Sequence, residues 1–170
     1  DYYWSQWNSE IMIKQFKEAV ALQPDGIAIY GFPGDAAMRP IIEEAMSMGI
    51  AITTMNTPLP ELEKTYKGDG FGYAGADLYT AGYNLGAKGV EVCGLSAGDK
   101  AFVWGLASMP NRGDRTTGAL DALKDLGVEI VYQEIPDNVN SDASQGIPMY
   151  VATYAANPDI KMVITDHGGL

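Results

Sequence analysis

The chain of 170 residues is 46% hydrophobic and 19% charged, a globular composition with enough apolar side chains for a core. This composition excludes a disordered tail, a collagen and a coiled coil, and no stretch approaches the roughly 18 consecutive apolar residues of a membrane span. Lys and Arg number 11 against 22 Asp and Glu, and the net charge of −11 should be repelled by phosphate backbones and anionic membranes. We therefore expect neither a nucleic-acid partner nor direct insertion into a membrane.

The scarcity of cysteine and histidine limits metal and redox chemistry. Cys93 is the single cysteine, so an internal disulfide is impossible and a thiolate metal cluster is nearly so. His167 is the single histidine, which leaves little for zinc binding or histidine-based catalysis. We expect no metal, no cofactor and no catalytic residue. Both ends of the sequence look cut, so we expect a piece of a longer chain and conclude nothing about a targeting segment.

The first half of the sequence alternates between helical and extended patterns. Apolar spacing predicts helices over 9–22 and 36–48, and strands over 27–30, 50–55 and 71–76. Asn8 or Ser9 suits the N-cap of the first helix and Asp35 that of the second, while Gly49 stands where a C-cap glycine belongs. Residues 56–70 are rich in Pro, Glu and Lys and are expected to form a loop.

The second half continues the alternation. The pattern predicts a helix from Asp77 through 85, a strand over 101–106, a helix from Asp114 or Thr116 to 126, a strand over 128–135, a helix over 142–157 and a strand over 161–165. Such alternation is typical of an α/β fold with parallel sheets and helices on both faces. The apolar runs at 27–30, 50–55, 102–106 and 161–165 predict parallel strands buried on both faces. We expect a seam between parts of the fold near Ala76 and Asp77.

Two glycine-containing segments match known functional motifs, but each also has a simpler structural interpretation. Residues 94–98 (GLSAG) match the nucleophile elbow of serine hydrolases, but that motif requires a strand followed by a helix, whereas a strand follows here. We therefore predict no hydrolytic role for Ser96. Residues 70–75 (GFGYAG) match a dinucleotide fingerprint, but a polar stretch precedes them and the glycines fall inside the strand itself. We interpret them as a glycine-rich strand that enters a crossover.

Ligands in open α/β sheets bind outside the carboxyl ends of the strands. Asn56 follows one predicted strand, and Asp166 and His167 follow another, so topology alone makes these three candidates. For a lone histidine at such a position, a surface or capping role is the preferred interpretation from the residues alone. The aromatic residues 2–4 and Trp7 could stack on a ring of a ligand, but such clusters are more often part of a core.

Several segments, taken in their order and spacing, resemble one family. These segments are residues 5–8 (SQWN), 24–27 (PDGI), 45–49 (AMSMG), 50–56 (IAITTMN), 73–77 (YAGAD), 115–120 (RTTGAL) and 157–160 (NPDI). Together they are similar to the periplasmic sugar-binding proteins of ABC transporters, of the ribose-binding and glucose/galactose-binding type. No single segment is specific, and their succession along nearly the whole chain carries the resemblance.

The resemblance implies two Rossmann-like lobes with parallel sheets, which are joined by a hinge and close on a sugar. On that template residues 1–76 form the first lobe without its first strand and helix, and residues 77–170 form the first part of the second lobe. The chain then crosses between the lobes at Ala76 and Asp77, which we expect to act as the hinge.

The resemblance also implies site residues. Asn56 stands where the family usually has an aspartate, and His167 stands where it usually has an asparagine. Asn111 and Arg115 match the positions of a polar residue and an arginine that hold sugar hydroxyls. Ser141 occupies a place where an aromatic side chain often covers a sugar face. These differences predict a ligand other than ribose or glucose, held by Asn56, Asn111, Arg115, His167 and Asp166.

The function implied is the solute-binding component of an ABC transporter. It would capture a monosaccharide or sugar alcohol and deliver it to a membrane permease, in the periplasm or as a lipid-anchored protein outside a Gram-positive cell. The chain would then not be an enzyme. The alternative within the same fold is the effector-binding domain of a LacI-type repressor, and a hydrolase acting through Ser96 is a third hypothesis.

Overall fold

The computed structural model describes residues 1–166 and divides the chain into two compact units. The first contains Asp1–Ala76 together with Pro110–Arg112, and the second contains Asp77–Met109 together with the chain from Gly113 onward. His167, which we expected to contact the ligand, lies outside the described residues. None of the helices in the described part of the chain is long and apolar enough to cross a membrane.

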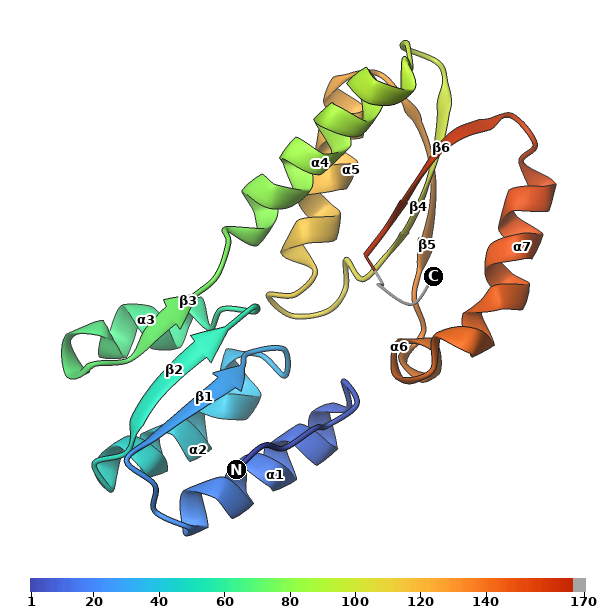
Figure 1. Ribbon diagram of the computed structural model, residues 1–170. Coiled ribbons are helices and arrows are strands. Elements are labelled where there is room, and N and C mark those ends of the chain that lie inside the picture. The colour runs from blue at the N-terminus through green and yellow to red at the C-terminus, as the bar shows by residue number, and fades with distance from the viewer. Residues whose placement is uncertain (167–170) are drawn as a thin grey trace. The chain divides into compact units, whose positions relative to one another are not determined.

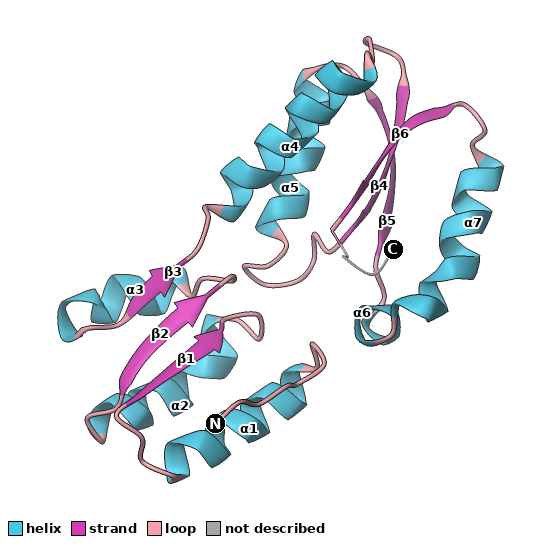
Figure 2. Ribbon diagram, viewed as in Figure 1, coloured by secondary structure: helices cyan, strands magenta, loops and turns pink. Residues whose placement is uncertain are grey.

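The first unit is built around a parallel three-stranded sheet, and its helices share one core with that sheet (Figures 1 and 2). Its elements are α1 (Ser9–Ala21), β1 (Gly26–Tyr30), α2 (Asp35–Ser47), β2 (Ala51–Met55), α3 (Pro60–Tyr66), the 3-10 turn η1 (Lys67–Asp69) and β3 (Gly72–Ala74). The strand order is β1-β2-β3, and both pairings are parallel, as predicted. Asn8 caps α1, because its side chain accepts a hydrogen bond from the Ile11 N–H at 2.9 Å.

The second unit is built around another parallel sheet, with helices on two sides of it (Figure 1). Its elements are α4 (Leu78–Cys93), β4 (Lys100–Gly105), α5 (Asp114–Asp125), β5 (Glu129–Glu134), α6 (Asp137–Ser141), the 3-10 turn η2 (Ala143–Gly146), α7 (Ile147–Ala156) and β6 (Ile160–Thr165). The strand order is β5-β4-β6, so β4 is central and pairs in parallel with both neighbours.

Strand β4 is buried on both faces, as predicted. Ala101 and Val103 pack into a core with α4 and α5, while Phe102 and Trp104 pack into a second core with Tyr150 of α7. Successive side chains of a strand point to opposite faces, so β4 supplies both cores in alternation. A strand covered in this way has no polar face, which explains its unbroken apolar run.

Burial on both faces is wrong for the other three apolar runs. In β2, Ile52 is buried, but Ala51 is exposed and Thr53 is half-buried. The buried side chains of the first unit form a single core with residues from α1, α2 and α3, and this core lies on one face of the sheet. In β6, Lys161 and Thr165 are exposed, because β6 lies at the edge of its sheet in the described chain.

Local structure differs from the sequence prediction in three further places. The expected loop 56–70 contains α3 and η1, because Pro60 begins a helical turn and Leu62 packs into the core. The expected helix 142–157 is divided, since Asp142 is extended and the chain passes through η2 before α7. Asp35 is not an N-cap: Gly34 holds that position, with φ of 87°.

Helices α4 and α5 pack with almost no space between their backbones. A Cβ atom added at Gly82 would lie 1.9 Å from the Arg115 carbonyl oxygen, and one at Gly118 would lie 2.1 Å from the Tyr79 carbonyl oxygen. Glycine is the residue that allows such an approach. The contact fixes the backbone of Arg115, which was expected to hold the ligand.

Replacing Gly82 by alanine should lower the free energy of unfolding by about 1–3 kcal/mol, because the methyl group must force α5 away. Helix propensity alone would favour alanine by about 1 kcal/mol, so the sign of the change reports on the packing. Chemical denaturation of the full-length protein, followed by circular dichroism, measures this free energy.

Gly89→Ala is the matched control on the same helix. A Cβ atom at Gly89 would meet the Met162 sulfur at 2.9 Å, and the end of that flexible side chain can move aside. We expect no loss of stability in this variant. Equal losses at Gly82 and Gly89 would contradict the proposed importance of the backbone contact.

Candidate functional site

The carboxyl edge of the second sheet gathers polar side chains from segments far apart in the sequence. Glu134 ends β5, Asp166 follows β6, and Ser108 lies in the loop after β4. Parallel pairing brings these strand ends to one edge, which is where α/β sheets bind ligands. Arg115 and Thr116 join them from the first turn of α5.

Arg115, Thr116 and Asp166 form one hydrogen-bonded network. The Arg115 Nε donates to Asp166 Oδ1 at 2.7 Å, and the Thr116 hydroxyl donates to Asp166 Oδ2 at 3.1 Å. The same hydroxyl accepts the backbone N–H of Leu106 at 3.0 Å. The Asp166 side chain is 8% exposed and the Arg115 side chain 31%, so the carboxylate is buried while the guanidinium reaches solvent. The network therefore presents a charged, planar hydrogen-bond donor at the sheet edge.

A second network holds the loop after β4. Glu134 Oε1 accepts the backbone N–H of Ser108 at 3.1 Å and its hydroxyl at 2.6 Å. The Tyr132 hydroxyl donates to Glu134 Oε2 and accepts the Ala107 N–H at 3.1 Å. Burial, followed by the hydrogen bond to Glu134, raises the pKa of Tyr132, so its hydroxyl keeps its proton and remains a donor at neutral pH.

The carboxyl edge of the first sheet carries Asn56, directly after β2. Asn56 is exposed and has a φ of 62°, a left-handed conformation that asparagine tolerates better than most residues. Its carbonyl oxygen accepts the Tyr73 hydroxyl at 3.1 Å. The backbone is therefore fixed from β3, while the side-chain oxygen accepts the Thr57 hydroxyl at 3.4 Å and the residue stays exposed.

Asp35 and Asn111 meet in the first unit. The Asn111 amide nitrogen donates to Asp35 Oδ2 at 3.0 Å and to the Pro58 carbonyl oxygen at 3.1 Å. Asp35 Oδ1 accepts the Leu62 N–H at 2.9 Å. Asn111, which we expected in the second lobe, thus groups with the first unit, and its amide nitrogen is engaged in protein contacts.

The remaining predicted residues have simple structural surroundings. Asp77 caps α4 by accepting the Thr80 N–H at 2.7 Å, and the Ala76 carbonyl oxygen accepts the Tyr73 hydroxyl at 2.8 Å. Their role as a hinge stays a prediction. Ser141 is exposed at the end of α6, where its hydroxyl donates to the Asp137 carbonyl oxygen at 3.1 Å.

Ser96 lies between the end of α4 and the start of β4, so a helix precedes it and a strand follows. This is the reverse of the order that a nucleophile elbow requires. Its N–H donates to Asp99 Oδ2 at 2.9 Å, which makes a tight turn. Residues 1–166 also contain no group of three or more His, Cys, Asp or Glu side chains placed to hold a metal ion.

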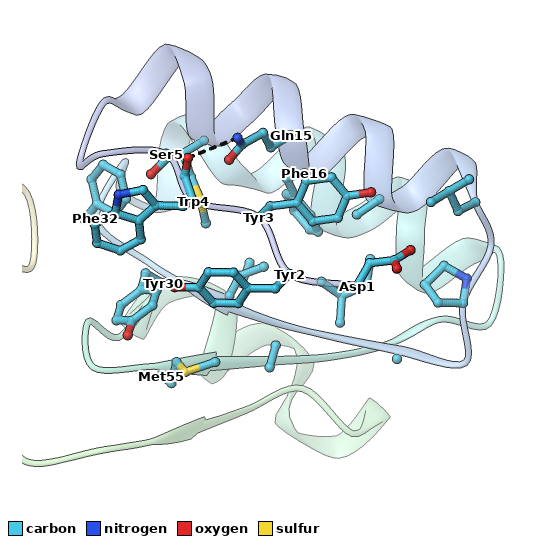
Figure 3. Close-up of a pocket in the computed structure, with 18 of the residues that line it drawn as sticks. Asp1, Tyr2, Tyr3, Trp4, Ser5, Gln15, Phe16, Tyr30, Phe32 and Met55 are labelled. Carbon is cyan, nitrogen blue, oxygen red and sulfur yellow. Dashed lines mark hydrogen bonds between the residues drawn. The ribbon is translucent and has the colours of Figure 1, made fainter.

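A groove of about 550 Å³ runs along β1 in the first unit (Figure 3). Residues 1–4, α1 and β1 line it, and its surface is mainly aromatic and aliphatic. The Trp7 ring packs edge-on against the Tyr30 ring, with 5.6 Å between ring centroids, and its centroid lies 5.5 Å from that of Phe32. Tyr2 is 83% exposed. The groove offers few polar partners for hydroxyl groups, so its chemistry suits apolar contacts more than a sugar.

Sequence reasoning missed Thr116, Tyr132 and Glu134 as members of the sheet-edge networks. The sequence indicates Thr116 only as a possible helix start, and the other two residues belong to a strand whose pattern alternates like that of a half-exposed strand. Glu134 could have been found from its position at the carboxyl end of a strand, because the same argument makes Asn56 a candidate. The partners of a buried carboxylate depend on which strands are neighbours, and spacing along the chain does not reveal this.

A family model described as a periplasmic binding protein domain matches residues 1–170. The chain therefore belongs to the periplasmic binding protein domain family, and its α/β fold with parallel sheets is the fold of that family. No match was found among curated proteins.

Three solved structures with a similar fold are described as binding proteins for sugars or other solutes. A glucose-galactose binding protein from Geobacillus stearothermophilus is 24% identical, with a TM-score of 0.73 over 93% of this chain and 53% of that one. A solute-binding protein from Burkholderia graminis, in complex with D-arabinose, is 19% identical, with a TM-score of 0.74 over 93% and 51% of the two chains. One from Actinobacillus succinogenes, with bound D-allose, is 24% identical, with a TM-score of 0.73 over 92% and 54%.

At these identities the similarity shows the fold, and this chain spans about half the length of each of the three proteins. All three are described as binding proteins for sugars or other solutes. None of them is described as a transcriptional repressor, so they do not favour the LacI-type alternative.

Replacing Thr116 by valine should destabilise the protein by about 1–3 kcal/mol, because the buried Leu106 N–H loses its acceptor and Asp166 loses a donor. Thr117→Val is the control: this neighbouring hydroxyl bonds to the Gly113 carbonyl oxygen at 3.2 Å within one turn. Equilibrium denaturation compares the two variants. A loss at Thr117 as large as that at Thr116 would argue against the network.

Proposed function

We propose that this chain is part of a solute-binding protein that captures a monosaccharide or sugar alcohol and delivers it to the membrane permease of an ABC transporter. The observation that carries the proposal is the match of the whole sequence to the periplasmic binding protein domain family. The protein would then act outside the cytoplasm, as a carrier and not as an enzyme. Capture between two lobes that hinge at Ala76 and Asp77 stays a prediction from the family resemblance.

The chemistry of the sheet edges supports a polyhydroxylated ligand. A sugar hydroxyl both donates and accepts, so a site for it needs donors and acceptors in fixed directions. Arg115 uses Nε to bond Asp166, and its two Nη groups are the donors that would reach adjacent hydroxyls. Asn56 offers an amide that can do both. The net charge of −11 makes an anionic ligand less favourable than a neutral one.

The proposal predicts that the full-length protein binds at least one neutral sugar or polyol. Calorimetric titration against a panel of pentoses, hexoses and sugar alcohols measures this binding. Arg115→Ala should weaken the affinity for that ligand about tenfold or more, because charged hydrogen bonds in a ligand site contribute at least about 1.5 kcal/mol.

Arg39→Ala is the matched control. Arg39 forms an exposed pair with Glu43 at 3.3 Å, within α2. Its loss should leave the affinity unchanged, since exposed pairs of this kind contribute little. A protein that binds no member of the panel would contradict the proposed function, and unchanged affinity in Arg115→Ala would remove Arg115 from the site.

A further inference from the structure

The Arg115 residue is held by contacts within the second unit, both at its backbone and at its side chain. Its backbone is fixed by the close approach of α4, where Gly82 leaves no room for a side chain next to the Arg115 carbonyl. Its Nε is fixed by Asp166 at 2.7 Å. An arginine side chain otherwise loses considerable rotamer entropy when it binds, so prior fixation saves part of that cost.

Asp166 is itself tied to three elements of the second unit. Its N–H donates to the Trp104 carbonyl oxygen, at the end of β4, at 3.0 Å. Its two carboxylate oxygens accept from Arg115 and from Thr116, at the start of α5. Asp166 directly follows β6, so this residue connects two strands and a helix. Each carboxylate oxygen thus already has a protein donor, and 8% of the side chain is exposed.

We propose that Asp166 is a positioning residue for Arg115 and does not contact the ligand. This assignment rests on the proposed function, and it changes the role predicted from the sequence, in which Asp166 was one of the ligand contacts. Asp166 holds Nε at 2.7 Å, and the Arg115 side chain is 31% exposed, so the two Nη groups are the atoms left to contact a ligand. Thr116 supports this arrangement by holding the second carboxylate oxygen.

The arrangement has a specific energetic consequence. If Asp166 acts through Arg115, removing Asp166 should not change the ligand affinity of a protein that already lacks the Arg115 side chain. If Asp166 contacts the ligand itself, its removal weakens binding whether or not Arg115 is present. A double-mutant cycle distinguishes the two cases, because it measures how far the effects of two substitutions depend on each other.

The experiment titrates the full-length protein with the sugar or polyol that it binds best. Asp166→Ala alone should weaken the affinity about tenfold, the effect of losing one hydrogen bond to a charged group. In the Arg115→Ala background the same substitution should change the affinity less than about twofold. A similar loss in both backgrounds would overturn the proposal. Asp166→Asn retains an acceptor for the Arg115 Nε, so this variant should bind the ligand with intermediate affinity. It replaces Asp166→Ala in the comparison if Asp166→Ala fails to fold.

Asp159→Ala is the matched control in the same sheet. Asp159 pairs with Lys100 at 2.7 Å, where β4 and β6 begin, at the edge opposite to Asp166. Its side chain is 62% exposed, and its removal should leave the affinity unchanged. A tenfold loss in this variant would show that any broken pair in the sheet weakens binding, which would overturn a special role for Asp166.

A second readout does not require a ligand. The Nε–H of Arg115 should give an NMR signal that exchanges slowly with water, because it is bonded to a buried carboxylate. The signal should be lost in Asp166→Ala and retained in Asp159→Ala. If no sugar binds, the proposed function fails while this signal still tests the positioning. If the signal persists without Asp166, the positioning role is wrong even when a sugar binds.

Discussion

Parallel pairing of β4 with β5 and β6 is the constraint on which the second unit depends. Parallel strands place all their carboxyl ends at one edge, and the connections between them must then cross over the faces as helices. In this unit the crossovers are α5 and α7, which bury the two faces of β4 in separate cores. The same pairing brings Glu134 and Asp166 to the edge where α5 begins with Arg115. The core and the candidate site are therefore products of one arrangement of strands.

The buried carboxylate of Asp166 holds Arg115 and Thr116 together at the carboxyl edge of the second sheet. A buried charge is costly unless it is paired and hydrogen-bonded, and Asp166 meets that requirement with the Arg115 guanidinium and the Thr116 hydroxyl. The two residues depend on each other: Arg115 neutralises the Asp166 carboxylate, and the carboxylate orients the Arg115 guanidinium. At the other sheet, Asn56 obtains its position from backbone geometry and from Tyr73, with no charge involved. The two edges thus offer different chemistry: a fixed charged donor on one and a neutral amide on the other.

The apolar groove beside β1 differs in chemistry from the polar edges of the two sheets. It is a large hollow in the first unit, yet aromatic and aliphatic groups line most of it. The polar networks lie instead at the strand ends, where the backbone turns and side chains such as Ser108 and Thr116 can meet. For a ligand made of hydroxyl groups, the direction of hydrogen bonds matters more than enclosed volume.

The sequence by itself determined the class of fold, the parallel strands and the family, because apolar periodicity and short glycine- or proline-containing connections are local properties. It also placed Asn56 and Asp166 correctly at the carboxyl ends of strands. Tertiary structure alone decided the burial of those strands: β4 has helices on both faces, whereas the helices of the first unit share one core on one face of β2. It also decided that Asp35 binds the Leu62 N–H and the Asn111 amide instead of capping its helix, and that Asp166 bonds Arg115, 51 positions away in the sequence. Hydrogen bonds over such separations depend on which strands become neighbours, and that choice is made by the packing of the whole unit.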